Sequence, residues 1–310
     1  MKSSGIGGQA VMEGIMMRNG SEYSVAVRKE NGEIEVKKET YKGVGSKCKL
    51  FRLPFIRGIF SFVDSLVLGM KSLNYSASLF MEDGEEEEEP GRFEKWLQKK
   101  FGDKAEKVIM DLTMVISIIL AMGIFMVFPT WVSTLMKPLL GNGIWMALFE
   151  GVLRIAIFIA YVGLISLMPD IKRTYMYHGA EHKCINCIEH GLELNVENVR
   201  KSSRQHKRCG TSFLFFVMIV SIIFCFFITA QSQIARVLIR LALRPVIAGV
   251  SYEIIKLAGN SENPFVNLLS RPGMWVQNMT TKEPDDDMIE VGIRAVEAVF
   301  DWKNWQKENL

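Results

Sequence analysis

The sequence predicts a mainly α-helical protein: an integral membrane bundle of about four spanning helices, with interfacial or amphipathic helices and a small cytoplasmic β-hairpin element. Three observations lead to this fold class. Hydrophobic residues make up 49% of the 310 residues and are concentrated in long segments. Basic residues gather in the loops on one side of those segments. All four histidines lie in one stretch between two of the apolar segments.

Three segments have the length and composition of spanning helices. Segments 112–136 and 211–233 contain no charged residue over 25 and 23 residues. Each exceeds the roughly 20 residues that a helix needs to cross a bilayer. Segment 144–168 contains two charged residues, Glu150 and Arg154, which stand at i and i+4 and can neutralise each other on one helix face.

A fourth span over 234–258 carries a weaker signal, because five charged residues interrupt it and Pro245 should kink it. Three of its arginines are spaced by four residues and therefore lie on one helix face. Packing between helices and contact with lipid headgroups explain such a stripe, and a site for anionic lipid phosphate is the alternative. The stripe consists of Arg236, Arg240 and Arg244.

The basic residues predict the orientation in the membrane. Loop 169–210 carries eight Lys or Arg, and the flank 95–107 carries five Lys. We therefore expect a multi-pass protein of the cell membrane with this loop and both termini in the cytoplasm. The first ten residues lack the apolar core of a signal peptide. Topology explains the net charge of +3 better than nucleic-acid binding does, so we expect a lipid bilayer as partner, no nucleic acid, and a homo-oligomer as one possible assembly.

The remaining segments are predicted from local pattern. Alternating residues around Asn31-Gly32 indicate a hairpin at 22–40. Residues 50–80 are apolar but punctuated by charges, which is typical of an interfacial or re-entrant segment. The predicted division is a Gly/Met-rich start with the hairpin (1–49), the interfacial segment (50–80), an acidic linker with an amphipathic helix (81–110), two spans (111–168), a cytoplasmic metal-motif loop (169–210), two further spans (211–259), and a cytoplasmic C-terminal loop and helix (260–310).

Residues 178–209 contain all four histidines and three of the five cysteines. His178 and His182 belong to an H-x-x-E-H motif, whose imidazoles lie on one face if the segment is helical. Cys-x2-Cys and His-x2-Cys pairs follow, spacings at which two ligands can reach one zinc ion. Imidazole and thiolate favour zinc, or another divalent transition metal, over magnesium or calcium. The pairs are Cys184 with Cys187 and His206 with Cys209.

Two ligand sets remain open. A closed structural shell would contain His178, His182, His206 and Cys209. An open catalytic site would have three protein ligands plus water, for example the first two histidines with Glu253. In the catalytic interpretation Glu181 is the general base and Arg208 stabilises developing negative charge. Further candidates near the site are Cys184, Cys187, Glu13 and Arg18.

Six segments carry a resemblance to a known family. They are GGQAVMEGIMMR at 7–18, RGIFSFVDSLVLGMKSL at 57–73, YHGAEHKCINC at 177–187, RCGTSFL at 208–214, RPVIAGVSYE at 244–253 and PGMWVQNMTTKEPDDDMIEV at 272–291. Together they resemble the YqhQ-like family of bacterial membrane proteins, a domain of unknown function described as predicted metal-dependent enzymes.

The resemblance implies a bacterial inner-membrane location and a characteristic set of polar residues. Cys184 stands where relatives often have threonine, which sets it apart from the other candidate ligands. The implied residues are His178, Glu181, His182, His206, Arg208 and Cys209, with Glu13, Arg18 and Glu253 in the other motifs.

Two functions follow as expectations. The first is a zinc-dependent hydrolase that acts on a membrane-proximal substrate. The second is a non-enzymatic assembly, transport or channel protein whose metal or polar network is structural. Ligand count distinguishes them: three protein ligands with Glu181 free favours catalysis, and four with Glu181 engaged elsewhere favours structure.

Overall fold

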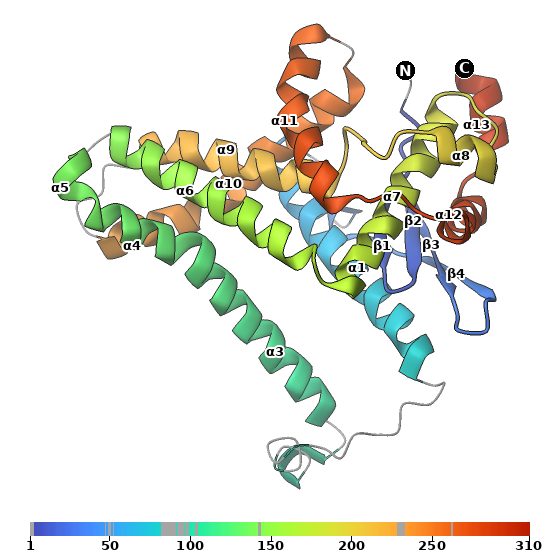
Figure 1. The fold of residues 1–310 in the computed structure, drawn as a ribbon, viewed down its shortest axis with the longest axis horizontal. Coiled ribbons are helices and arrows are strands. Elements are labelled where there is room, and N and C mark those ends of the chain that lie inside the picture. The colour runs from blue at the N-terminus through green and yellow to red at the C-terminus, as the bar shows by residue number, and fades with distance from the viewer. Residues whose placement is uncertain are drawn as a thin grey trace.

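A computed structural model of the protein describes residues 3–46, 48, 51, 53–81, 91, 96, 99–102, 105–141, 144–227, 233–261 and 263–310. The chain is mainly helical, with one small antiparallel sheet. Of the predicted acidic linker and amphipathic helix at 81–110, the acidic residues 85–89 lie outside the described residues. Figure 1 shows the sheet and the helices packed on it at the right of the view, and the long helices α3 and α6 at the left.

The sheet has four strands in the order β1-β2-β3-β4, all antiparallel. The predicted hairpin is present as β3 (Glu22–Arg28) and β4 (Ile34–Thr40). The sequence did not reveal β1 (Gly7–Val11) and β2 (Gly14–Asn19). Both faces of β2 are covered, so its residues 14–17 are all buried and show no alternation of apolar and polar residues.

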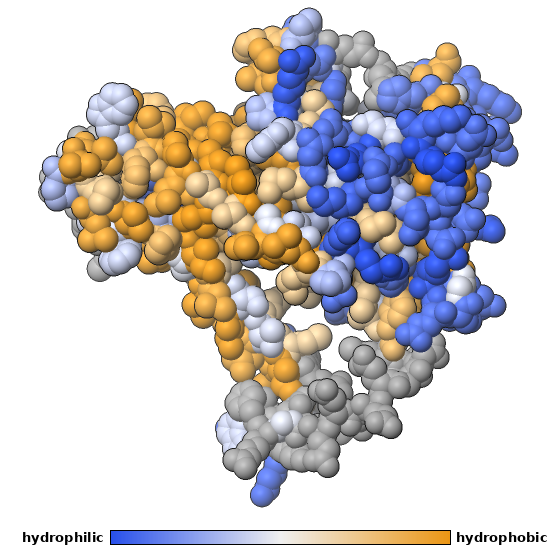
Figure 2. Space-filling model, viewed as in Figure 1, coloured by the Kyte–Doolittle hydropathy of each residue, from blue (hydrophilic) through white to orange (hydrophobic). Residues whose placement is uncertain are grey.

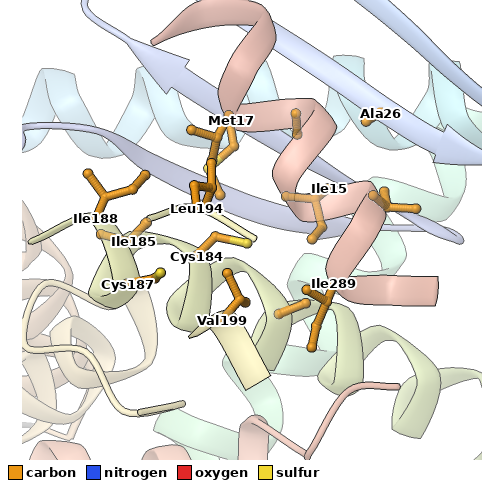
Figure 3. Packing of buried hydrophobic residues seen from close by; sticks show 14 of the residues in the cluster. Ile15, Met17, Ala26, Cys184, Ile185, Cys187, Ile188, Leu194, Val199 and Ile289 are labelled. Carbon is orange, nitrogen blue, oxygen red and sulfur yellow. The ribbon is translucent and has the colours of Figure 1, made fainter. Parts of the chain in front are cut away.

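One face of the sheet carries the largest apolar core of the described residues. Four helices contribute to it: α7 (Pro169–Glu189), α8 (Val196–Lys201), α12 (Asp286–Val299) and α13 (Trp302–Asn309). Figure 3 shows side chains of α7 and α12 packed against Ile15 and Met17 of the sheet. The predicted cytoplasmic loop 169–210 is therefore largely helical and belongs to a packed core.

The other face of the sheet is covered by α1 (Ile56–Met81), whose Leu68 is fully buried there. This helix is continuous over 26 residues, and the re-entrant alternative for 50–80 stays a prediction. Its N-terminal part packs along α10 (Gln233–Asn260), where a Cβ atom at Gly58 would lie 2.6 Å from the Tyr252 side chain. An interfacial location for α1 remains a prediction.

Two helical stretches of the described residues are long and apolar enough to cross a membrane: Val108–Leu135 with 28 residues and Ile144–Ile165 with 22. The first comprises α3 (Ala105–Met122), a π-helical turn η4 (Gly123–Val127) and α4 (Phe128–Leu135), followed by the short α5 (Lys137–Leu140). The second is α6. They coincide with the first two predicted spans.

The third and fourth predicted spans stay predictions. Helix α9 (Gly210–Phe226) has 17 residues, which gives about 25 Å against a hydrocarbon core of about 30 Å. Residues 228–232 lie outside the described part of the chain. Helix α10 is long enough, but its charges lower its hydropathy. The loop expected in the first part of 260–310 is in fact largely helical: it contains α11 (Pro264–Thr280), whose N-cap Asn263 accepts a hydrogen bond from the Phe265 amide.

The surface is divided between the two ends of the molecule. Figure 2 shows hydrophobic residues covering the left of the view, over α3 to α6, and hydrophilic residues covering the sheet and its helices. Large apolar side chains are exposed along both candidate spans; Ile119 is 58% and Val152 58% exposed. Both chain termini lie at the hydrophilic end (Figure 1).

Candidate metal centre

Helix α7 supplies two histidines to one point. His178 and His182 are one turn apart, and their ring centroids are separated by 4.4 Å. Gly179 stands between them because the chain after α11 crosses the helix there. A Cβ atom at this position would lie 2.0 Å from the carbonyl oxygen of Lys282. The same crossing segment brings the Thr280 carbonyl to His178.

Backbone carbonyl groups orient both imidazoles. His178 Nδ1 lies 2.9 Å from the Thr280 oxygen, and His182 Nδ1 lies 2.7 Å from the Arg204 oxygen. A carbonyl oxygen only accepts, so each Nδ1 carries a hydrogen and donates it. The Nε2 atoms are then the ones left for a metal, which is the usual arrangement of outer contacts around zinc-binding histidines.

Cys209 completes the group from another part of the chain. Its Sγ lies 3.3 Å from His178 Nε2, and the ligand atoms of His178, His182 and Cys209 all lie within 4.8 Å of one another. A tetrahedral zinc ion with bonds of 2.0–2.3 Å needs ligand atoms about 3.3–3.8 Å apart. These donors are borderline-soft nitrogen and sulfur atoms, and the group could hold such an ion after a small contraction.

The negative charge on Cys209 and the positive charge on the neighbouring imidazoles stabilise each other. Burial by itself would raise the pKa of the Cys209 thiol, but the neighbouring His178 and His182 outweigh this and hold it well below its ordinary value. Burial would lower the pKa of His178, yet the Cys209 sulfur and Glu181 raise it to about 9. The Thr211 amide, 3.4 Å from the sulfur at the start of α9, adds a donor. The site therefore favours a thiolate.

Glu181 lies beside this group, within ion-pair distance of His178 when that imidazole is protonated. It is 4% exposed, and its Oε2 is 3.9 Å from His178 Nε2. Among the described residues it accepts no hydrogen bond from a protein group. Strand β1 closes this side of the site, since a Cβ atom at Gly8 would lie 3.0 Å from Glu181 Cγ. The carboxylate is thus available to a small molecule at the site.

The structure directs His206 away from the other three predicted ligands. Its ring centroid is 5.8 Å from that of His182, but its Nε2 lies 3.5 Å from Glu189 Oε2. The Gln277 side chain fixes its backbone by bonds to both its amide and its carbonyl group. Of the expected shell, the structure therefore brings together His178, His182 and Cys209. His206, the fourth expected ligand, is not part of this group.

Glu189 is the residue that the sequence analysis missed. It is 3% exposed and accepts hydrogen bonds from the Ser4 amide and hydroxyl groups, each at 2.7 Å, and from Arg208. Burial would raise its pKa, but His206 and Arg208 lower it to about 2. The sequence offered one signal for Glu189, namely its position two helical turns after Glu181 on α7. Arg208 donates hydrogen bonds to Glu189 and to the Ser3 hydroxyl, and it does not contact the metal group.

Four other predicted candidates lie elsewhere. Glu253 pairs with Arg57 of α1, so it is not placed as a metal ligand. Glu13 binds Arg173 and the Tyr177 hydroxyl from the tight turn between β1 and β2, where its φ of 47° is unusual for a residue other than glycine. Cys184 and Cys187 point into the apolar core, as Figure 3 shows.

The last of the predicted additional residues is Arg18. Its Nε donates a hydrogen bond to the Gly20 carbonyl at 2.8 Å, and its guanidinium lies over the Tyr41 ring. It therefore stabilises the end of strand β2 and the turn that follows, and the structure does not bring it to the metal group.

A second charged group lies among the apolar helices. As predicted, Glu150 and Arg154 pair within α6, at 2.6 Å. Arg240 was expected on a stripe that serves packing between helices and contact with headgroups; it is 6% exposed and packs between helices, where it binds the same carboxylate and Thr130 of α4. A buried carboxylate therefore decides where this arginine points. The side chain of Arg236 lies outside the described residues.

These features define a mainly helical protein with a small antiparallel sheet, two apolar helices of membrane-spanning length, and a His/His/Cys group able to bind a metal. The chain belongs to the family of proteins of unknown function DUF1385, whose model matches residues 53–302. It is 33% identical over 304 residues to the uncharacterized protein YqhQ of Bacillus subtilis (strain 168), a match that covers 98% of this chain and 94% of that protein. No solved structure matches it.

Proposed function

We propose that the protein is a membrane-embedded, zinc-dependent hydrolase with its metal centre at the cytoplasmic face. One observation carries the proposal: His178, His182 and Cys209 present three ligand atoms within 4.8 Å, while Glu181 beside them is buried and accepts no hydrogen bond from another described residue. Three protein ligands are typical of catalytic zinc sites, and four of structural ones. A spare carboxylate next to such a group is what a general base requires.

The surface supports a membrane location. The apolar helices expose large side chains over one end of the molecule, and the other end is hydrophilic (Figure 2). We place α3–α4 and α6 across the bilayer and assign α9 and α10 as the third and fourth spans. Arg240 of α10 supports this assignment, because charged residues within membranes face the bundle interior and pair with one another. The basic residues of 169–210 support a cytoplasmic location for the hydrophilic end.

Each residue at the site has a defined task in this proposal. When bound, zinc would supply Lewis-acid chemistry and lower the pKa of water toward neutrality. Glu181 would take the proton of the attacking water and return it to the leaving group. The amide groups that open α9 provide positive potential where negative charge develops. Arg208, held by Glu189, positions the segment that carries Cys209.

The substrate follows only as a class. Cys209 immediately precedes α9, and only three residues lie between the end of α6 and the start of α7. The metal group therefore lies where the chain leaves the apolar helices, and a substrate anchored in the lipid would reach it. We propose an amide or ester in a membrane-bound peptide or lipid-linked molecule.

The decisive measurement is whether the metal has an open position. We expect the purified full-length protein to hold one zinc ion per chain and, after exchange for cobalt, to change its visible spectrum when acetohydroxamate is added. Glu181→Gln should keep the metal and lose function in a complementation assay. Glu197→Gln, a change at an exposed carboxylate paired with Lys201, is the matched control and should be fully functional.

The rival interpretation predicts different results. In this interpretation the metal links α7 to the start of α9 and has no catalytic role. Acetohydroxamate then leaves the cobalt spectrum unchanged, and Glu181→Gln complements as well as the control. That pair of results would replace the hydrolase by a structural metal site in an assembly, transport or channel protein.

A further inference from the structure

The charged group among the apolar helices has an excess of positive charge. It contains two guanidinium groups, of Arg154 and Arg240, and one carboxylate, of Glu150. Their exposed fractions are 7%, 6% and 3%. Among the described residues, no other acidic side chain pairs with either arginine. One unit of positive charge is therefore buried here, which is unfavourable unless a counter-charge is supplied.

Both arginines also keep a hydrogen-bond donor unused. Glu150 accepts from Arg154 Nη2 and from both terminal nitrogens of Arg240, and Thr130 Oγ1 accepts from Arg240 Nη1 at 2.9 Å. The Nε atoms of both arginines are buried and have no partner among the described residues. Unsatisfied buried donors are rare, and each calls for an unseen partner or a functional role. Excess charge and free donors call for the same partner, an anion.

The position of the group restricts the kind of anion. Arg154 is the eleventh of the 22 residues of α6, so it lies halfway along a proposed span. One turn further along α6, Ile157 borders a groove of about 530 Å³, which is within the size range of ligand sites. Its lining is entirely apolar: Ile119, Leu120, Gly123, Ile124, Phe128 and Ile157.

We propose that this part of the protein binds an anionic amphiphile, with its single oxyacid group on Arg154 and Arg240 and its hydrocarbon chain in the groove. The guanidinium groups match the carboxylate or phosphate of such a molecule by charge and by planar donors. The groove, about 4.5 Å along the helix axis from Arg154, matches the chain. The inference is independent of the metal centre and adds a second site to the protein.

Binding of two probes to full-length protein in an uncharged detergent tests this. Oleate, measured by displacement of a fluorescent fatty acid, represents a free carboxylate, and phosphatidylglycerol, measured by native mass spectrometry, represents a phospholipid. We expect one equivalent of at least one of them, and the arm that binds identifies the source. Arg240→Met should weaken that binding at least tenfold. Arg57→Met is the matched control, since Arg57 forms a one-to-one pair with Glu253, and should bind as the wild type does.

A second variant addresses the groove and does not disturb the charges. Ile157→Trp should weaken the long-chain probe several-fold and leave competition by butyrate or inorganic phosphate unchanged. The proposal is overturned if neither long-chain probe binds, or if Arg240→Met and Ile157→Trp both bind as the wild type does. Equal affinity for butyrate and oleate would also overturn it, because a bare anion would then be the ligand.

Discussion

Cys209 Sγ lies 3.3 Å from His178 Nε2 although 31 residues separate them in the chain. Helix α7, the segment around α8 and the start of α9 must all pack correctly for these two atoms to meet. The position of Cys209 relative to the histidines therefore depends on the tertiary fold, whereas the approach of the two histidines of α7 to each other depends only on one helical turn. This distinction governs what the following substitutions should do.

The first prediction concerns the ligand set. Cys209→Ser should lower zinc affinity by more than the roughly 10- to 100-fold typical of changes in outer contacts, because it removes a donor. His206→Gln should stay within about tenfold of the wild type, since its Nε2 faces Glu189. Competition with a chromophoric chelator measures both. Equal losses of zinc affinity in the two variants would mean that His206 is a fourth ligand.

The second prediction concerns protonation of the ligands. In protein stripped of metal with a chelator, Cys209 should be a thiolate at neutral pH and His178 an imidazolium, because the thiolate raises the pKa of that histidine to about 9. Zinc must displace the His178 proton, so its affinity should rise about tenfold per pH unit up to pH 9. The thiolate absorbance of the wild type minus that of Cys209→Ser checks the first part. A difference spectrum without thiolate at neutral pH would contradict it.

The third prediction is a loss of stability in acid that depends on Glu189. Its pKa is about 2 in the folded protein against an ordinary value of 4.5. A lowered folded-state pKa stabilises the protein above the unfolded value, and this contribution is lost as the pH falls from about 4.5 toward 2. The loss amounts to about 3 kcal/mol at most.

Thermal unfolding in detergent between pH 7 and pH 3 tests this dependence. Glu189→Gln should be less stable than the wild type at neutral pH, and the gap should narrow in acid. Glu193→Gln, a change to the exposed carboxylate that follows on the same segment, serves as the control and should track the wild type. A gap that stays constant with pH would show that the Glu189 charge is not responsible.

The fourth prediction concerns the glycine inside the H-x-x-E-H motif. Gly179→Ala should destabilise the protein by about 3 kcal/mol, because its methyl group would overlap the Lys282 carbonyl oxygen at 2.0 Å. It should also weaken zinc binding by displacing Thr280 from His178. Thermal unfolding and zinc affinity are the two measurements.

Gly163→Ala in α6 is the matched control for this substitution. A Cβ atom there meets only Met279 Cε at 3.6 Å, and alanine is the better helix former by about 0.5–1 kcal/mol. This variant should therefore be as stable as the wild type or more so. Unchanged stability and zinc affinity in Gly179→Ala would mean that the crossing chain moves aside easily.

Sequence alone determined the features that rest on local spacing and composition. The two apolar helices of spanning length, the pairing of Glu150 with Arg154, and the approach of His178 to His182 all depend on neighbours within one helix or on a continuous run of residues. Such relations follow from the 3.6-residue period and from the free energy of transfer into lipid. The hairpin at Asn31-Gly32 follows in the same way from a turn that needs a positive φ.

Tertiary structure alone decided which distant residues meet. Cys209 joins the metal group while His206 turns to Glu189; Arg240 takes Glu150 of another helix as its partner; and the two strands at 7–19 form because helices cover both faces of the sheet. A buried charge takes the partner that packing brings near, and a strand buried on both faces loses its alternating pattern. Neither effect leaves a periodic mark in the sequence.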